Sequence, residues 1–60
     1  MIVKRIDAGI YNVNHNGADY ELERYPDGSW LLFSKAKNDN SPREYMNDFA
    51  TRREALDALA

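Results

Sequence analysis

The sequence predicts an α+β domain in which a three-stranded antiparallel sheet packs on one C-terminal helix, in the order β-β-β-α. Residues 16–17, Asn-Gly, are the strongest local sign of a hairpin, because a type I′ turn needs two residues with positive φ. Residues 26–28, Pro-Asp-Gly, predict a second turn closed by a left-handed glycine. Residues 49–59, FATRREALDAL, contain a helix start followed by apolar residues at helical spacing.

The two turns predict one consistent strand register. Counting outward from the Asn-Gly turn pairs Val13 with Tyr20, and counting from the Pro-Asp-Gly turn pairs Leu22 with Leu32. A slip of one residue in either hairpin would mix glutamates into the apolar face, so this register is the favoured one. The shared apolar face consists of Tyr11, Val13, Tyr20, Leu22, Trp30 and Leu32.

The remaining segments are assigned by composition and by capping signals. Residues 1–6, MIVKRI, suit a further short strand before a bend at residues 7–9. Residues 35–48 are mostly polar and are predicted to form a surface loop. In the alternative, Tyr45 and Met46 form a short edge strand and the sheet has four strands. The helix begins after Thr51 as N-cap, and its apolar stripe is expected to pack on the face that carries Trp30.

Length and composition limit the classes of protein. The 60 residues form a single domain, and a chain of this size buries only about 60% of its unfolded surface. Without cysteine and with one histidine, neither a disulfide framework nor the usual zinc site is available. No signal peptide or membrane span is recognisable, which favours a cytoplasmic protein with no membrane contact. The formal net charge of −2 disfavours nucleic acid as the partner.

No catalytic or cofactor site is predicted. The sequence has no glycine-rich phosphate loop and no assignable Ser-His-Asp set. His15 is expected to be a turn residue at a hairpin tip rather than a metal ligand. Glu21 and Glu23 are expected two apart on an open strand face, as solvated carboxylates without the pocket that an acid/base pair needs. The chain is therefore predicted not to be an enzyme.

The segments GIYNV, ADYELERYPDGSWLLF and FATRREALDAL resemble the N-terminal arm-type DNA-binding domain of tyrosine integrases. They are more distantly similar to the ethylene-response DNA-binding domain of plants. The resemblance covers residues 9–60 and implies a three-stranded sheet on one helix, with the outer sheet face in the DNA major groove. Here that face would carry Glu21 and Glu23, which repel phosphate. In length and general composition the chain is also similar to small free-standing bacteriophage proteins.

The outer sheet face is the predicted interface. If the helix covers the Trp30 side, no segment remains to cover the apolar residues on the opposite side, and burying each one on a partner is worth about 1.5 to 3 kcal/mol. The predicted interface residues are Ile10, Asn12, Glu21, Glu23, Leu31 and Phe33.

A second group of residues is basic. The candidate contacts for phosphate or for an acidic partner are Arg52, Arg53, Lys35 and Lys37. For Arg52 and Arg53 the favoured interpretation is neutralisation by Glu54 and Asp48.

The favoured function is a non-catalytic protein-binding module, such as a phage-type accessory or inhibitor protein. Its acidic-apolar sheet face would dock a host protein or a second copy of the chain. The first alternative is a DNA-binding domain resembling the integrase arm-type domain, and the second is a structural homodimer. The acidic face favours protein binding over DNA binding, because phosphate contacts need lysine and arginine.

Overall fold

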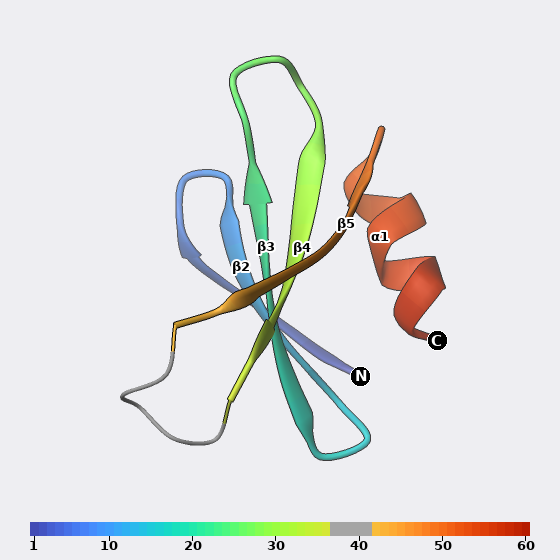
Figure 1. Cartoon of the computed structure of the whole chain (residues 1–60). Coiled ribbons are helices and arrows are strands. Elements are labelled where there is room, and N and C mark those ends of the chain that lie inside the picture. The colour runs from blue at the N-terminus through green and yellow to red at the C-terminus, as the bar shows by residue number, and fades with distance from the viewer. Residues whose placement is uncertain (37–41) are drawn as a thin grey trace.

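The computed structural model describes residues 1–36 and 42–60 (Figure 1). It is a small α+β domain with one antiparallel sheet in the order β1-β2-β3-β4-β5 and a C-terminal helix. The elements are β1 (Ile2–Asp7), β2 (Ile10–His15), β3 (Ala18–Arg24), β4 (Trp30–Lys35), β5 (Glu44–Phe49) and α1 (Arg52–Leu59). The predicted class is confirmed, but the prediction of three or four strands is wrong, because the sheet has five.

The register of both predicted hairpins is confirmed. Val13 lies opposite Tyr20 between β2 and β3, and Leu22 lies opposite Leu32 between β3 and β4. At the first turn Asn16 has φ 53° and the following glycine has φ 80°, as a type I′ turn requires. The apolar residues of the central strands therefore share one side of the sheet.

Of the two outer strands, β1 has the predicted length and is shifted by one residue, whereas β5 is longer than the sequence indicated. β1 pairs with β2 along its length, with an irregularity between Arg5 and Asp7 where the chain turns. β5 replaces most of the C-terminal half of the predicted loop and pairs with β4, setting Tyr45 against Phe33 and Phe49 against Trp30. These two aromatic pairs explain why a polar segment forms a strand, since cross-strand aromatic contacts stabilise a sheet.

The hydrophobic core lies between the sheet and α1. It consists of Val13, Leu22, Leu32 and Ala55. Leu22 and Leu32 were predicted to be buried, which is confirmed, whereas Trp30 and Tyr20 are only half-buried. The eight-residue helix packs beside β4 and β5 and is too short to cover the whole sheet face (Figure 1).

The predicted N-cap is confirmed. The Thr51 hydroxyl accepts a hydrogen bond from the Glu54 amide at 3.1 Å, which satisfies one of the free amides of the first turn. The Glu54 carboxylate reaches back to the amide of Ala50, at 3.3 Å. It caps the residue before the N-cap, one position away from the usual capping box.

Candidate protein-binding surface

The outer face is the side of the sheet that faces away from α1, and part of it is already covered by the chain itself. The Arg43 guanidinium lies 3.8 Å from the centre of the Phe33 ring, and Tyr45 packs edge-on against the same ring at 6.2 Å. Phe33 is therefore only 7% exposed. The expectation that no segment covers Ile10, Leu31 and Phe33 is wrong for Phe33, and the other two side chains are half-buried.

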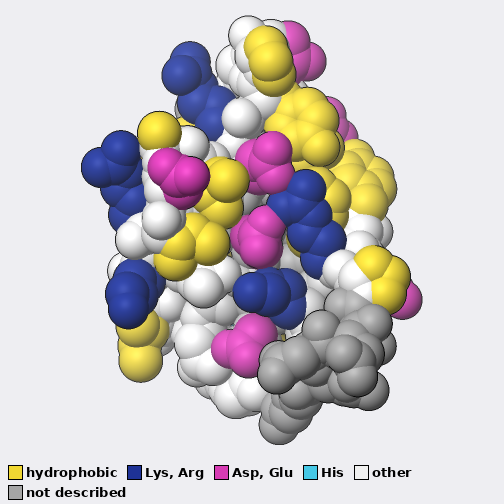
Figure 2. Space-filling model, turned by 90° about the vertical axis from the view of Figure 1, so that its left-hand side faces the viewer, with side chains coloured by type: hydrophobic (Ala, Val, Ile, Leu, Met, Phe, Trp, Pro, Cys, Tyr) yellow, Lys and Arg dark blue, Asp and Glu magenta, His cyan; other side chains and the backbone are white. Residues whose placement is uncertain are grey.

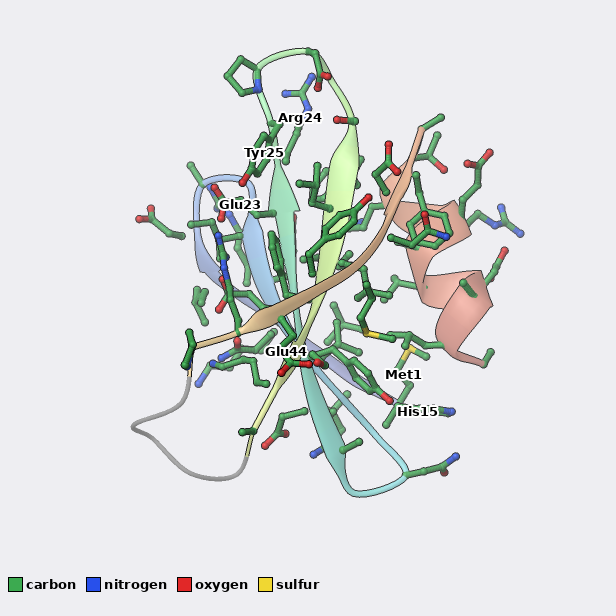
Figure 3. All side chains as sticks on the ribbon, in the orientation of Figure 1. Met1, His15, Glu23, Arg24, Tyr25 and Glu44 are labelled. Atoms are coloured by element: carbon green, nitrogen blue, oxygen red, sulfur yellow. The ribbon has the colours of Figure 1, made fainter. Side chains whose placement is uncertain are left out.

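The predicted acidic character of this face is also corrected. Arg43 pairs with both Glu21 and Glu23, its Nη1 atom lying 2.8 Å from Glu23 Oε1. Lys35 adds a longer contact of 3.8 Å to Glu21. Figure 2 shows acidic and basic side chains alternating down the middle of this face, and Figure 3 shows Glu23 directed away from α1. The carboxylates are neutralised within the fold rather than left for a basic partner.

The pKa of the Arg43 guanidinium reflects this arrangement. Partial burial acts to lower the pKa, but hydrogen bonds and attraction from Glu23 and Glu21 outweigh it and raise the pKa above its ordinary value. Arg43 therefore stays charged and holds the two strand carboxylates together. Sequence reasoning placed Arg43 in a diffuse basic loop segment and missed this pairing, because Glu21 lies 22 residues away along the chain.

Next to this charged stripe, the outer face has a hollow of about 260 Å³ that borders β1. Its polar and apolar lining includes Ile2, Lys4, Asn12, Asn14, Asp19 and Lys35. Asn14 donates a hydrogen bond to Asp19 at 2.8 Å, and Lys35 lies 3.5 Å from the side-chain oxygen of Asn12. The predicted interface residue Asn12 thus belongs to a polar network beside β1, where it lies opposite Lys4.

The predicted basic residues do not form one site. Arg52 lies over the ring of Tyr11 at 4.6 Å on the helix side of the sheet, whereas Lys35 lies on the outer face. Arg53 is exposed on α1, and Lys37 lies outside the described residues. The fold places Arg52, Arg53 and Lys35 on different surfaces of the protein.

The expected neutralisation of the helix arginines is not found among residues 1–36 and 42–60. Glu54 caps the helix through the Ala50 amide, and Asp48 accepts a hydrogen bond from the Tyr45 hydroxyl at 3.0 Å. That bond raises the pKa of Tyr45. Arg52 is instead held by the face of an aromatic ring, a contact worth about 0.5 to 1 kcal/mol at an exposed site.

The free edge of β1 is a structural feature that sequence reasoning missed. All six residues of this strand are exposed, with Ile2 at 69%, Ile6 at 48% and Val3 at 40%. β1 ends the strand order, so one of its backbone edges has no partner in the described part of the chain. A sign of this edge was present in MIVKRI, where β-branched residues fall on both faces of a strand, as in a strand that pairs with another chain.

No metal or membrane site is apparent in the described residues. No group of three or more His, Cys, Asp and Glu side chains there could hold a metal ion. His15 lies at the turn between β2 and β3, with its Nε2 atom 3.3 Å from the side-chain Nδ2 atom of Asn16 (Figure 3). Within the same residues, no helix is both long and apolar enough to cross a membrane.

Comparison with known proteins yields no relative: no family model, no curated protein and no solved structure matches this chain.

Proposed function

We propose that this protein is a non-catalytic protein-binding module that takes an extended segment of another protein onto the free edge of β1. The carrying observation is that all six residues of this strand are exposed and that its second edge has no partner among residues 1–36 and 42–60. Adding a strand to an exposed sheet edge is a common mode of peptide recognition, in which main-chain hydrogen bonds supply affinity. The phage-type accessory role suggested by size and composition stays a prediction.

The hydrogen-bonding pattern of the sheet identifies which residues a partner strand would meet. In a two-residue hairpin the residues flanking the turn form a hydrogen-bonded pair, so His15 and the alternate residues before it bond β3. Gly9 belongs to the same alternate set as His15, and its carbonyl accepts a hydrogen bond from the Arg24 amide at 2.8 Å. The residues between them, including Asn12 and Asn14, therefore bond β1.

The backbone groups of β1 follow the same alternation, pointing in turn toward β2 and toward the free edge. Ile2 lies opposite Asn14 and Lys4 opposite Asn12, so their amides and carbonyls point into the sheet. The amides and carbonyls of Val3 and Arg5 then point to the free edge. A partner strand would bond these two residues.

Self-association through β1 is the less favoured use of this edge. When β1 pairs antiparallel with the same strand of a second copy, every register that joins nearly the full strand sets Lys4 or Arg5 directly against Lys4 or Arg5. Like charges directly opposite each other destabilise a strand pair. This argument favours a different protein as the partner over the structural homodimer.

A proline at position 3 tests this proposal. Val3→Pro removes an outward amide and is tolerated on an edge strand, so the fold is expected to persist. Peptides selected from a random display library on the wild-type protein should lose at least about tenfold in affinity for this variant, since main-chain bonds carry such binding. Val3→Thr keeps both the amide and the β-branch and should bind like wild type.

The display experiment can also contradict the proposal. Circular dichroism and a urea melt establish first that Val3→Pro is folded. Selected peptides that bind the folded proline variant as tightly as wild type would place the binding surface elsewhere. Amide shifts confined to the Phe33 side of the sheet would return the interface to the outer face.

DNA binding is the second candidate, because arginines gather around an aromatic pair on the helix side. Tyr11 and Trp30 lie 5.8 Å apart, Arg52 lies over Tyr11, and the register places Arg5 opposite Tyr11 and Arg24 opposite Trp30. Arginine with aromatic side chains suits nucleic acid. This surface lies on the opposite side of the sheet from the one that the arm-type resemblance implies.

We expect duplex DNA to bind only weakly, with a shallow dependence on salt, because few cations converge on one surface and the formal net charge is −2. Trp30 is the single tryptophan, so its fluorescence reports on contacts near this cluster during a titration. Sub-micromolar affinity at physiological salt that is lost in Arg52→Ala with Arg53→Ala would favour DNA binding instead.

A further inference from the structure

We infer that the segment taken up by β1 carries two consecutive acidic residues followed by two apolar ones, in an antiparallel arrangement. This inference rests on the proposed function and names the chemistry of its partner. It starts from two adjacent cations, Lys4 and Arg5, which form no ion pair among the described residues. Adjacent strand residues point to opposite faces, so the two charges lie on opposite sides of the same edge.

Lys4 marks the outer side of the edge. It borders the hollow on the outer face, where Lys35 is the other cation and Asp19 the carboxylate. Asp19 is engaged by Asn14, and Lys35 lies near Glu21 at 3.8 Å. A carboxylate on an added strand would therefore find Lys4 as its nearest uncommitted charge.

Arg5 marks the helix side. It lies opposite Tyr11, whose ring is covered by the Arg52 guanidinium. Arg24 lies one strand further on, diagonal to Tyr11 in the β2–β3 register. Asp7, the nearest acidic residue along β1, accepts a hydrogen bond from the Ala8 amide at 2.7 Å. This side of the edge is therefore cationic, and an acidic side chain opposite Arg5 would meet attraction from several arginines.

The apolar half of the pattern comes from the start of the strand. Ile2 lies on the outer side and Val3 on the helix side, and both are exposed. Read in the antiparallel direction, the partner residues opposite Arg5, Lys4, Val3 and Ile2 are acidic, acidic, apolar and apolar. Opposite charges and β-branched pairs across two strands each stabilise the pairing.

The test uses a capped peptide of sequence Thr-Thr-Glu-Glu-Val-Val-Thr-Thr, titrated against the full chain and followed by amide chemical shifts. The matched peptides carry Gln-Gln or Lys-Lys in place of Glu-Glu. We expect the Glu-Glu peptide to bind roughly tenfold more tightly than the Gln-Gln peptide at low salt, from two cross-strand ion pairs. This preference should shrink toward 1 M salt because the pairs are exposed.

A charge swap provides the stricter control. In the double variant Lys4→Glu with Arg5→Glu, the Lys-Lys peptide should bind better than the Glu-Glu peptide, reversing the wild-type order. Arg53→Gln removes a helix arginine without touching β1 and should leave the order unchanged. Each variant is compared with wild type in a urea melt, so a loss of folding is not mistaken for a loss of binding.

The outcomes separate this inference from the proposed function. If the Glu-Glu and Gln-Gln peptides bind equally and both shift the Val3 and Arg5 amides, strand addition stands and the acidic preference is wrong. Tighter binding of the Lys-Lys peptide to wild type would likewise overturn the preference. If none of the three peptides shifts these amides, and display also yields no binder sensitive to Val3→Pro, then strand addition at β1 is itself wrong.

Discussion

Replacing Leu22 with alanine is expected to lower the free energy of unfolding by about 2 to 5 kcal/mol, the range for large-to-small changes in a core. Leu22 is 0% exposed and lies in the cluster with Val13, Leu32 and Ala55, so the lost methyl groups leave a cavity between sheet and helix. Small domains have little stability to spare. The measurement is a urea melt followed by Trp30 fluorescence.

Leu56→Ala is the matched control for this prediction. Leu56 is on α1 and only half-buried against the same core, so its replacement should cost less than that of Leu22. The sequence-based expectation for Leu56→Ala is a loss of about 2 to 5 kcal/mol, because the sequence predicts Leu56 to be a core residue. A Leu22 variant within a few tenths of a kcal/mol of wild type, or one more stable than the Leu56 variant, would contradict the described core.

The central hairpins could be predicted because their determinants are local. Asn16 and Gly17 adopt the positive φ values that their turn requires, and each turn fixes a register for its whole hairpin. The helix start was predictable for the same reason, since Thr51 and Glu54 act within one turn. Local chemistry thus determined the middle of the sheet and the beginning of α1.

The outer strands and the site depend on contacts between distant segments. β5 has polar residues on both faces, and only the pairing of its aromatic residues with β4 makes it a strand. Arg43 meets Phe33, Glu21 and Glu23 from a segment that was predicted to be a loop. The six predicted interface residues do lie on the two outer-facing rows that the register implied. No local pattern could show that Arg43 covers Phe33 and pairs with Glu21 and Glu23.

Phe33→Ser is expected to lower the free energy of unfolding by about 3 to 5 kcal/mol, as for loss of a buried aromatic ring. Phe33 is 7% exposed and is packed by Arg43 and Tyr45. The sequence-based interpretation predicted the opposite, that Leu31→Ser with Phe33→Ser would spare the fold and abolish association. That expectation assumed an uncovered outer face.

Leu31→Ser alone separates these two interpretations. Leu31 is half-buried and lies opposite Asp48 at the β4–β5 pairing, so its loss should cost clearly less than that of Phe33. Urea melts of the two single variants and the double variant, together with sedimentation, measure folding and association separately. Because Arg43 would lose its ring while Glu21 and Glu23 stay in place, the Phe33 variant should also loosen the start of β5, seen as faster amide exchange at Tyr45. A double variant that melts like wild type, with association lost, would restore the outer face as the interface.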